Sequence, residues 1–262
     1  MAAVLDVSNL GINFGGLQAL DDFNIQVRSR EIVGLIGPNG AGKTTVFNLL
    51  TNVYHPSKGG ISLTGRNTLG KATHEVTKYG IARTFQNIRL FKSLSVIDNV
   101  RIALHNSMTY SLLEACLRLP KYWRQEAAAT KFSRELLGVF GMEAVADAPA
   151  GSLPYGAQRR LEIVRALATN PKVLLLDEPA AGMNPSETSE LMGTIRGVRD
   201  KFEVAIILIE HDMSLVMGIC ERIIVLNYGL IIAQGEPDEI RNNPLVVEAY
   251  LGQQRGSSPC SR

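Results

Sequence analysis

Long hydrophobic runs are absent from this 262-residue sequence. A helix that spans a bilayer needs about 18 consecutive apolar residues. The longest apolar stretches here, Val204 to Ile209 and Ile223 to Leu226, have the length of buried strands. The start, Met1 to Asp6, lacks the basic region and apolar run of a signal peptide. These absences predict a chain that is made in the cytoplasm and stays there.

The sequence also has little cysteine and no marked excess of one charge. Its three cysteines, Cys116, Cys220 and Cys260, form no ligand-like pairs. Such an odd, scattered set fits a reducing cytoplasm better than a disulfide framework. The net charge of +2 and pI near 8.4 are close to balance. Nucleic-acid binding would normally show as a basic patch or stripe, so we expect no nucleic-acid partner.

Apolar residues are nevertheless plentiful enough for one large domain. The hydrophobic share of 45% is ample for a packed core and argues against global disorder. The region up to about Leu63 predicts a series of short strands. These strands are Leu5 to Val7, Ile25 to Val27, Glu31 to Ile36 and Ile61 to Leu63.

From about Ser95 to about Ala148 the pattern becomes helical. Ser95 to Asp98 resembles a capping box, and Pro120 marks a break, which together predict a helical lobe inserted into the chain. Afterwards helices alternate with apolar strands. The expected elements are a helix from about Gly156 to Ala168, a strand Val173 to Leu176, a helix after Pro185, a strand Ala205 to Ile209, and hairpin strands Ile223 to Leu226 and Leu230 to Ala233. This alternation predicts an α/β fold with a mainly parallel, covered sheet and an antiparallel edge.

One segment carries an unbroken phosphate-loop motif. Gly37-Pro38-Asn39-Gly40-Ala41-Gly42-Lys43-Thr44 fits GxxxxGK[ST], between a predicted strand and a predicted helix. Its glycines let backbone N–H groups converge on phosphate oxygens at a helix N-terminus. Lys43 adds positive charge at the β- and γ-phosphates, and Thr44 offers a hydroxyl to Mg²⁺. The motif therefore predicts a site for the phosphates of a nucleotide with bound Mg²⁺.

An acidic pair follows a buried strand further along the chain. The apolar run Val173 to Leu176 ends in Asp177, which suits a carboxylate placed at the Mg²⁺ of a neighbouring phosphate loop. Glu178 follows at once and can polarise the attacking water. A turn that is merely solubilised by two acids is the alternative, and the phosphate loop disfavours it.

The segment Leu153-Pro154-Tyr155-Gly156-Ala157-Gln158, called here the signature segment, resembles the signature motif of ATP-binding cassette (ABC) proteins. The resemblance implies a P-loop NTPase fold in a single nucleotide-binding domain, residues 1–252. Within it we expect a RecA-like core of about 1–94 and 150–240 and a helical subdomain of about 95–149. The polar residues 253–262 form an expected flexible tail.

The same resemblance implies a role for further residues. Phe14 would stack on adenine, and Thr45 would join the phosphate loop in binding ATP. Gln86 would sense Mg²⁺ and the attacking water, so the implied Mg²⁺ ligands are Thr44, Gln86 and Asp177. The implied catalytic residues are Glu178, His211 and Gln86. In this family, the signature of one subunit faces the ATP of the other, so Tyr155, Gly156, Ala157 and Gln158 would contact ATP in trans.

Two positions depart from the family pattern. Pro154 stands where Ser is usual, and Tyr155 where a second Gly is usual. Pro154 removes a hydroxyl and an N–H, although proline is tolerated in the first turn of a helix. Asn184 stands where the loop at the subunit contact usually has Asp. These departures put a phosphate contact and some signalling between subunits in question.

Several stretches resemble the ATP-binding subunits of branched-chain amino acid importers. They are Phe14 to Ala19, Arg83 to Phe91, Tyr155 to Ile163, Ile209 to Met213 and Asn242 to Gly252. The resemblance implies uptake of branched-chain or related hydrophobic amino acids at the cytoplasmic face of a bacterial or archaeal cell membrane. Implied partners are two integral membrane permease subunits, a second and paralogous cassette and, indirectly, a periplasmic or extracellular substrate-binding protein.

The membrane subunits would meet the surface from Asn87 to Leu94, unless Leu90 and Phe91 simply pack the lobe against the sheet. Three other functions stay open at this stage. Lipopolysaccharide-exporting cassettes share the Arg-Arg-x-Glu-Ile helix and the Glu-His-Asp segment. A nucleotide kinase would use the phosphate loop but needs no signature segment. A non-transport cassette acting as a clamp on nucleic acid or ribosomes is disfavoured by the balanced charge.

Overall fold

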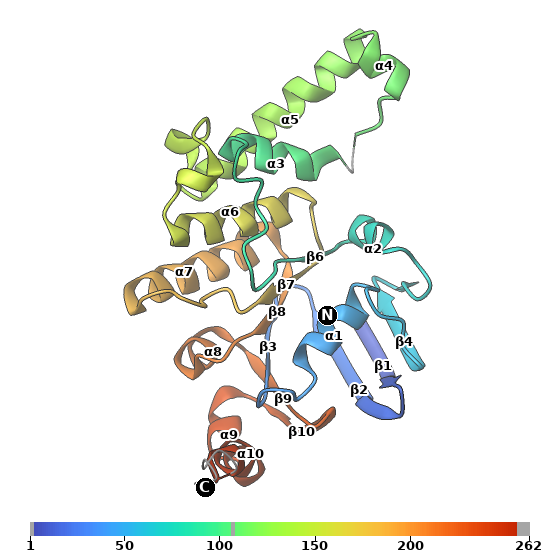
Figure 1. Ribbon diagram of the computed structural model, residues 1–262, viewed down its shortest axis with the longest axis vertical. Coiled ribbons are helices and arrows are strands. Elements are labelled where there is room, and N and C mark those ends of the chain that lie inside the picture. The colour runs from blue at the N-terminus through green and yellow to red at the C-terminus, as the bar shows by residue number, and fades with distance from the viewer. Residues whose placement is uncertain (1–2, 106–107, 256–262) are drawn as a thin grey trace, which may run out of the picture.

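The computed structural model describes residues 3–105 and 108–255. Figure 1 shows two β-sheets in the lower part of the molecule, helices along one side of the central sheet, and a helical lobe projecting at the top. The arrangement is the α/β fold with a mainly parallel central sheet that the sequence predicts. Within the described ranges, no helix is both long and apolar enough to cross a membrane.

The central sheet has six strands in the order β10-β9-β3-β8-β7-β6. Its strands are β3 (Ile32–Ile36), β6 (Ile81–Arg83), β7 (Val173–Asp177), β8 (Ala205–Ile209), β9 (Arg222–Asn227) and β10 (Leu230–Gly235). Neighbours pair in parallel except β9 and β10, which form the predicted antiparallel edge. Every residue of β3, β7 and β8 is buried, which explains their unbroken apolar runs.

The N-terminal strands form a separate antiparallel sheet, order β2-β1-β4-β5, rather than part of the central sheet. It comprises β1 (Ala3–Phe14), β2 (Leu17–Arg28), β4 (Lys58–Leu63) and β5 (Arg66–Asn67). The expectation of short strands was wrong for β1 and β2, which have twelve residues each. The β1–β2 register shifts repeatedly, for example between Val7 and Leu10, and such irregularities break the alternation by which a strand is recognised.

Two apolar clusters cover the faces of the central sheet. Along β3, Ile32 and Ile36 belong to one cluster, and Val33 and Leu35 belong to the other. This division follows from the alternation of side chains along a strand. The second cluster also holds Phe47 of α1 (Lys43–Leu50) and the buried residues of the antiparallel sheet, so α1 packs with both sheets.

The other helices outside the lobe lie along the chain before and after the lobe. They are α2 (Thr73–Tyr79), α6 (Tyr155–Ala168), α7 (Pro185–Phe202), α8 (Met213–Ile219), α9 (Pro237–Arg241) and α10 (Pro244–Arg255). The buried apolar residues of α6, α7 and α8 belong to the first cluster. The tail expected from Gln253 is helical as far as Arg255. The rest of that expected tail lies outside the described residues.

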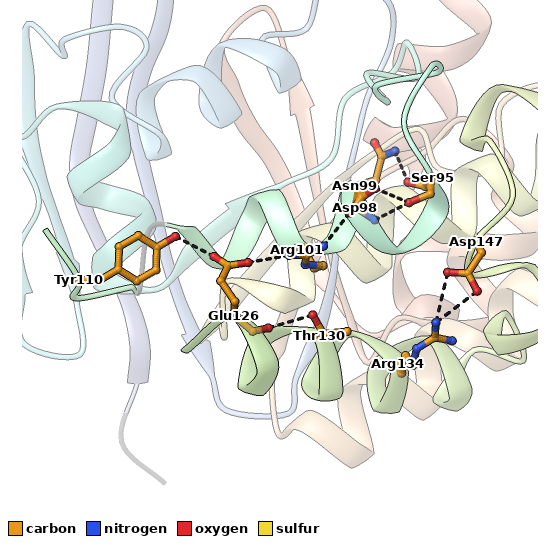
Figure 2. A network of polar contacts seen from close by, with 9 residues as sticks. All are labelled: Ser95, Asp98, Asn99, Arg101, Tyr110, Glu126, Thr130, Arg134 and Asp147. Atoms are coloured by element: carbon orange, nitrogen blue, oxygen red, sulfur yellow. Dashed lines mark hydrogen bonds and ion pairs between the residues drawn. The ribbon is translucent and has the colours of Figure 1, made fainter. Parts of the chain in front are cut away.

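The lobe consists mainly of α3 (Val96–Leu104), α4 (Leu112–Cys116) and α5 (Pro120–Val139). Ser95 caps α3 through the N–H of Asp98, and Pro120 begins α5, so the predicted start and break are both confirmed. A polar network joins the helices (Figure 2): Glu126 of α5 binds Arg101 of α3 and accepts a hydrogen bond from the Tyr110 hydroxyl at 2.8 Å. Two short 3₁₀ turns, Glu143–Val145 and Ala150–Ser152, lead from α5 towards α6.

Candidate nucleotide-binding site

The candidate site lies where three parallel strands end side by side. β3 leads into the phosphate loop, β7 ends in Asp177, and β8 ends at Ile209, which pairs with Asp177. The carboxyl ends of parallel strands share one edge of a sheet. The order β3-β8-β7 therefore gathers the phosphate loop, Glu178 and His211, which are far apart in the sequence.

The phosphate loop depends on two glycines. Gly37 has φ 150°, and a Cβ there would lie 2.1 Å from the Leu226 carbonyl oxygen. Gly42 has φ 108° and is the N-cap residue of α1. Both need a backbone that residues with side chains rarely adopt. The loop thus turns sharply from β3 into the N-terminus of α1, where free N–H groups and the helix dipole favour an anion.

The Lys43 ammonium is held inside this loop. Nζ donates to the carbonyl oxygens of Gly37, at 2.6 Å, and Pro38, at 3.0 Å. Burial lowers the pKa of Lys43, and the carboxylates of Glu178 and Asp177 oppose that shift. A cation in this position can pair with phosphate oxygens at little cost in rearrangement.

Glu178 joins the other two predicted catalytic residues. Its Oε2 accepts from Gln86 Nε2 at 2.6 Å, and its Oε1 lies 2.9 Å from His211 Nε2. The backbone of Glu178 is left-handed, with φ 47°, and its N–H donates to Ile209 O at 2.9 Å. A non-glycine residue in this conformation is strained, and such strain is concentrated at functional sites. The carboxylate is therefore held at the open edge of the sheet by two side chains.

Asp177, by contrast, pairs with a residue that the sequence reasoning missed. Its Oδ2 lies 2.7 Å from Arg83 Nη2, and both side chains are less than a tenth exposed. Arg83 also donates to Asn48 Oδ1 at 2.7 Å. The sequence shows Arg83 as a charged residue after an apolar stretch, but this does not indicate its partner. Only the pairing of β6 with β7 brings Arg83 to Asp177.

Glu210 and Asp212 shape the loop that carries His211. Glu210 is buried and accepts from the N–H groups of Ala180, at 2.7 Å, and His211, at 3.1 Å. Burial raises the pKa of Glu210, while these hydrogen bonds act against the rise. Asp212 caps α8 through the N–H groups of Ser214 and Leu215. Both carboxylates accept hydrogen bonds from backbone N–H groups. These bonds fix the loop and so orient His211 towards Glu178.

A cleft of about 450 Å³ opens beside these residues. It is lined by Leu17, Gln18, Ala19, Asn39, Gly40, Ala41, Gly42, Lys43, Thr44, Thr45, Glu178, His211 and Tyr228. Tyr228 was recognised only as part of a hairpin turn, and nothing in a turn pattern places it beside the phosphate loop. Phe14 is outside this lining; it lies near the β1–β2 turn, edge-on to Tyr54 with ring centroids 5.2 Å apart.

The signature residues lie away from the cleft. Tyr155 to Gln158 form the first turn of α6, and none of them appears among the described residues that line the cleft. Gly156 and Ala157 border a small hollow of about 110 Å³ between α6 and α7, whose lining is Pro154, Gly156, Ala157, Arg160, Met183, Glu187, Glu190 and Leu191. Within one chain, the predicted ATP site and the predicted trans contact are therefore separate places.

Comparisons with known proteins identify the family and the relatives of this chain. The profile of the family described as ABC transporter matches residues 20–181, and that of the branched-chain amino acid ATP-binding cassette transporter matches residues 231–255. The high-affinity branched-chain amino acid transport ATP-binding protein LivG of Salmonella typhimurium is 47% identical over 95% of this chain and 98% of its own. BraF of Pseudomonas aeruginosa, which has the same description, is 44% identical over the same shares.

A more distant relative and a solved structure complete the comparison. The lipopolysaccharide export system ATP-binding protein LptB of Acidithiobacillus ferridurans is 34% identical over 97% of this chain and 99% of its own. The structure of the ADP conformation of MJ1267, an ATP-binding cassette of an ABC transporter, has a TM-score of 0.83 and 29% identity over 96% of this chain and all of its own. The chain belongs to the ABC transporter family, as an ATP-binding subunit that hydrolyses ATP.

Proposed function

We propose that this chain supplies the ATP hydrolysis for an importer of branched-chain or related hydrophobic amino acids. Its similarity to LivG and BraF over nearly the whole chain supports the cargo class, as does the C-terminal match at residues 231–255. The similarity to the lipopolysaccharide export protein is lower, at 34% identity. The importer is therefore the better-supported transporter type.

The observation that carries the hydrolytic role is the Glu178 carboxylate between Gln86 and His211. We propose that Glu178 is the general base that takes a proton from the attacking water. His211 and Gln86 orient that carboxylate and the water. The loop N–H groups and Lys43 bind the phosphates and stabilise the charge that develops on the transferred phosphoryl group.

The residues present also suit a Mg²⁺ ion. Thr44 lines the cleft, and Arg83 engages only Oδ2 of Asp177. Gln86 uses its Nε2 to donate to Glu178, so its amide oxygen is the atom suited to a cation. These three are oxygen ligands of the kind Mg²⁺ prefers. We propose Thr44, Asp177 and Gln86 as its ligands; when bound, the ion neutralises charge on the β- and γ-phosphates.

We further propose that two cassettes share two ATP molecules. The separation of the signature segment from the cleft supports this arrangement, since a segment that cannot reach the ATP of its own chain can serve a partner's. The N-terminus of α6 and the bare Gly156 amide are suited to an anion. The partner cassette is a paralogue in this proposal, and Phe14, near the β1–β2 turn, stacks on adenine.

The proposed contact with the membrane subunits is the surface from Asn87 to Leu94. Phe91 is about half exposed, while Asn99 clamps its backbone by accepting from its N–H and donating to its carbonyl. Arg89 O accepts from Arg165, and Leu90 packs against the core. An ordered backbone that presents an apolar ring to solvent supports docking of a membrane-subunit segment at the cytoplasmic face of the membrane.

Purification of the assembly in gentle detergent tests this proposal. We expect two permease proteins and a second cassette to copurify in stoichiometric amounts, as identified by mass spectrometry. Recovery of a lipopolysaccharide-export assembly would replace the cargo assignment. Recovery of the chain without any membrane partner would contradict the transport role altogether.

A further inference from the structure

Tyr155, which stands where the family usually has Gly, makes contacts within its own chain. The Tyr155 hydroxyl donates to the Ala181 carbonyl at 2.9 Å. Its ring lies beside Gly182, where an added Cβ would come within 3.6 Å of the ring. Ala181 and Gly182 belong to the loop between Glu178 and α7. A glycine at position 155 could make neither contact, because both use the tyrosine side chain.

Arg159, one turn further along α6, extends this contact to the Gln86 segment. Its Nη2 donates to the Tyr155 hydroxyl at 3.0 Å and also to the Gln86 carbonyl. Its Nη1 donates to the Phe85 carbonyl at 2.8 Å. Arg159 is 3% exposed, and its charge is balanced by Glu162, whose Oε2 lies 3.2 Å from Nη1. A buried arginine with this many partners holds them in fixed relative positions.

The contacts close a ring around the candidate base. Gln86 donates from its side chain to Glu178 and accepts at its carbonyl from Arg159. Arg159 binds Tyr155, Tyr155 binds Ala181, and the Ala181 N–H donates back to the Glu178 carbonyl at 3.2 Å. Hydrogen bonds thus link Gln86 and Glu178 to the first turn of α6.

We propose that Tyr155 is a positioning residue that couples the hydrolytic site of its own chain to the signature segment. The idea rests on the proposed sharing of ATP between two cassettes. When Gln86 and Glu178 are in their hydrolytic arrangement, Arg159 and Tyr155 hold the start of α6 and the Ala181 loop in the position that a partner's ATP requires. Each chain thereby presents its signature according to the state of its own cleft.

The test is Tyr155→Phe in the assembled transporter, because phenylalanine keeps the ring against Gly182 and removes only the hydroxyl. We expect kcat for ATP hydrolysis to fall about three- to tenfold, the loss typical of one hydrogen bond. The KM for ATP should not change, and the Tm should fall by a few degrees at most, because Arg159 keeps its partners at Phe85, Gln86 and Glu162. Tyr122→Phe, in the helical lobe, is the matched control and should leave all three values unchanged. An unchanged kcat in Tyr155→Phe would overturn the proposal.

A double-mutant cycle separates coupling from simple structural damage. Arg159→Lys keeps the charge but cannot reach all the partners of the guanidinium, so it should also lower kcat. If both residues act through one link, the double variant should lose little more than the worse single variant. Strictly multiplicative losses would overturn the proposal.

Glu178→Gln in the same preparation tells the two possible failures apart. If it abolishes hydrolysis while Tyr155→Phe behaves like the unmodified transporter, only the coupling is wrong. If hydrolysis survives Glu178→Gln, the assignment of the general base within the proposed function is wrong.

Discussion

At the scale of single residues, Glu178 combines a left-handed backbone with two side-chain partners, Gln86 and His211. Glu178→Gln keeps the shape of the side chain and removes its basicity. We expect ATP binding to persist while turnover falls about 100-fold or more. Equilibrium binding and single-turnover hydrolysis measure the two effects separately. Glu135→Gln, at an exposed position of α5, is the control; full turnover in Glu178→Gln would refute the assignment of the base.

Substitution of Lys43 should weaken ATP binding, whereas substitution of Glu178 should mainly lower turnover. The Lys43 ammonium already lies in the loop, bound to the Gly37 and Pro38 carbonyls. Lys43→Ala removes the cation that meets the phosphates, so we expect the Kd for ATP to rise at least about tenfold. Isothermal titration with a non-hydrolysable ATP analogue measures it. Lys131→Ala, at an exposed pair on α5, should bind normally, and normal binding by Lys43→Ala would count against the assigned role.

At the scale of elements, Asn184 has a clear structural function. Its Oδ1 accepts from the Glu187 N–H, and Glu187 Oε2 accepts from the Asn184 N–H, both at 3.0 Å, which caps α7. Asn184→Ala should lower the free energy of unfolding by about 1 kcal/mol, and Asn184→Asp should keep it, since both Asn and Asp cap well. Urea denaturation tests this, with Ser186→Ala as control. Equal losses in Ala and Asp variants would contradict a capping role.

The start of α6 is the other helix end where this chain departs from its family. Pro154 is the N-cap residue of α6 and makes no side-chain capping hydrogen bond. Pro154→Ser adds a hydroxyl that can cap the helix or meet a partner's phosphate. We expect the ATPase rate of the assembled transporter to rise. An unchanged rate would mean that Gly156 and the helix dipole already suffice.

At the scale of the whole molecule, ATP and Mg²⁺ should stabilise the fold because their proposed ligands come from distant segments. Thr44 lies in the first turn of α1, Gln86 follows β6, and Asp177 ends β7. A ligand at 100 times its Kd adds about 2.7 kcal/mol to the free energy of unfolding. In Glu178→Gln, ATP with Mg²⁺ should raise the Tm, and replacing Mg²⁺ by EDTA should reduce that rise. A rise that is the same without Mg²⁺ would contradict the proposed metal ligands.

Contiguous motifs and local periodicity were readable from the sequence alone. The phosphate loop is eight consecutive residues between a strand and a helix, and the run before Asp177 is apolar because β7 is buried throughout. These signals are local, so they need no knowledge of neighbouring strands. The same locality made the α/β class and the helical lobe predictable. The roles of Gln86 and His211 were predicted only from the resemblance to ABC proteins, because no local motif around these two residues indicates a catalytic role.

Only the tertiary structure decided which distant segments meet. Arg83 reaches Asp177 because β6 pairs with β7, and Tyr228 lines the cleft because β9 lies next to β3. Tyr155 reaches Ala181 because α6 begins beside the loop that precedes α7. The separate N-terminal sheet likewise depends on strand order and on shifts of register. The pairing of strands that are far apart in the sequence is set by packing across the whole core, and no local pattern of residues encodes it.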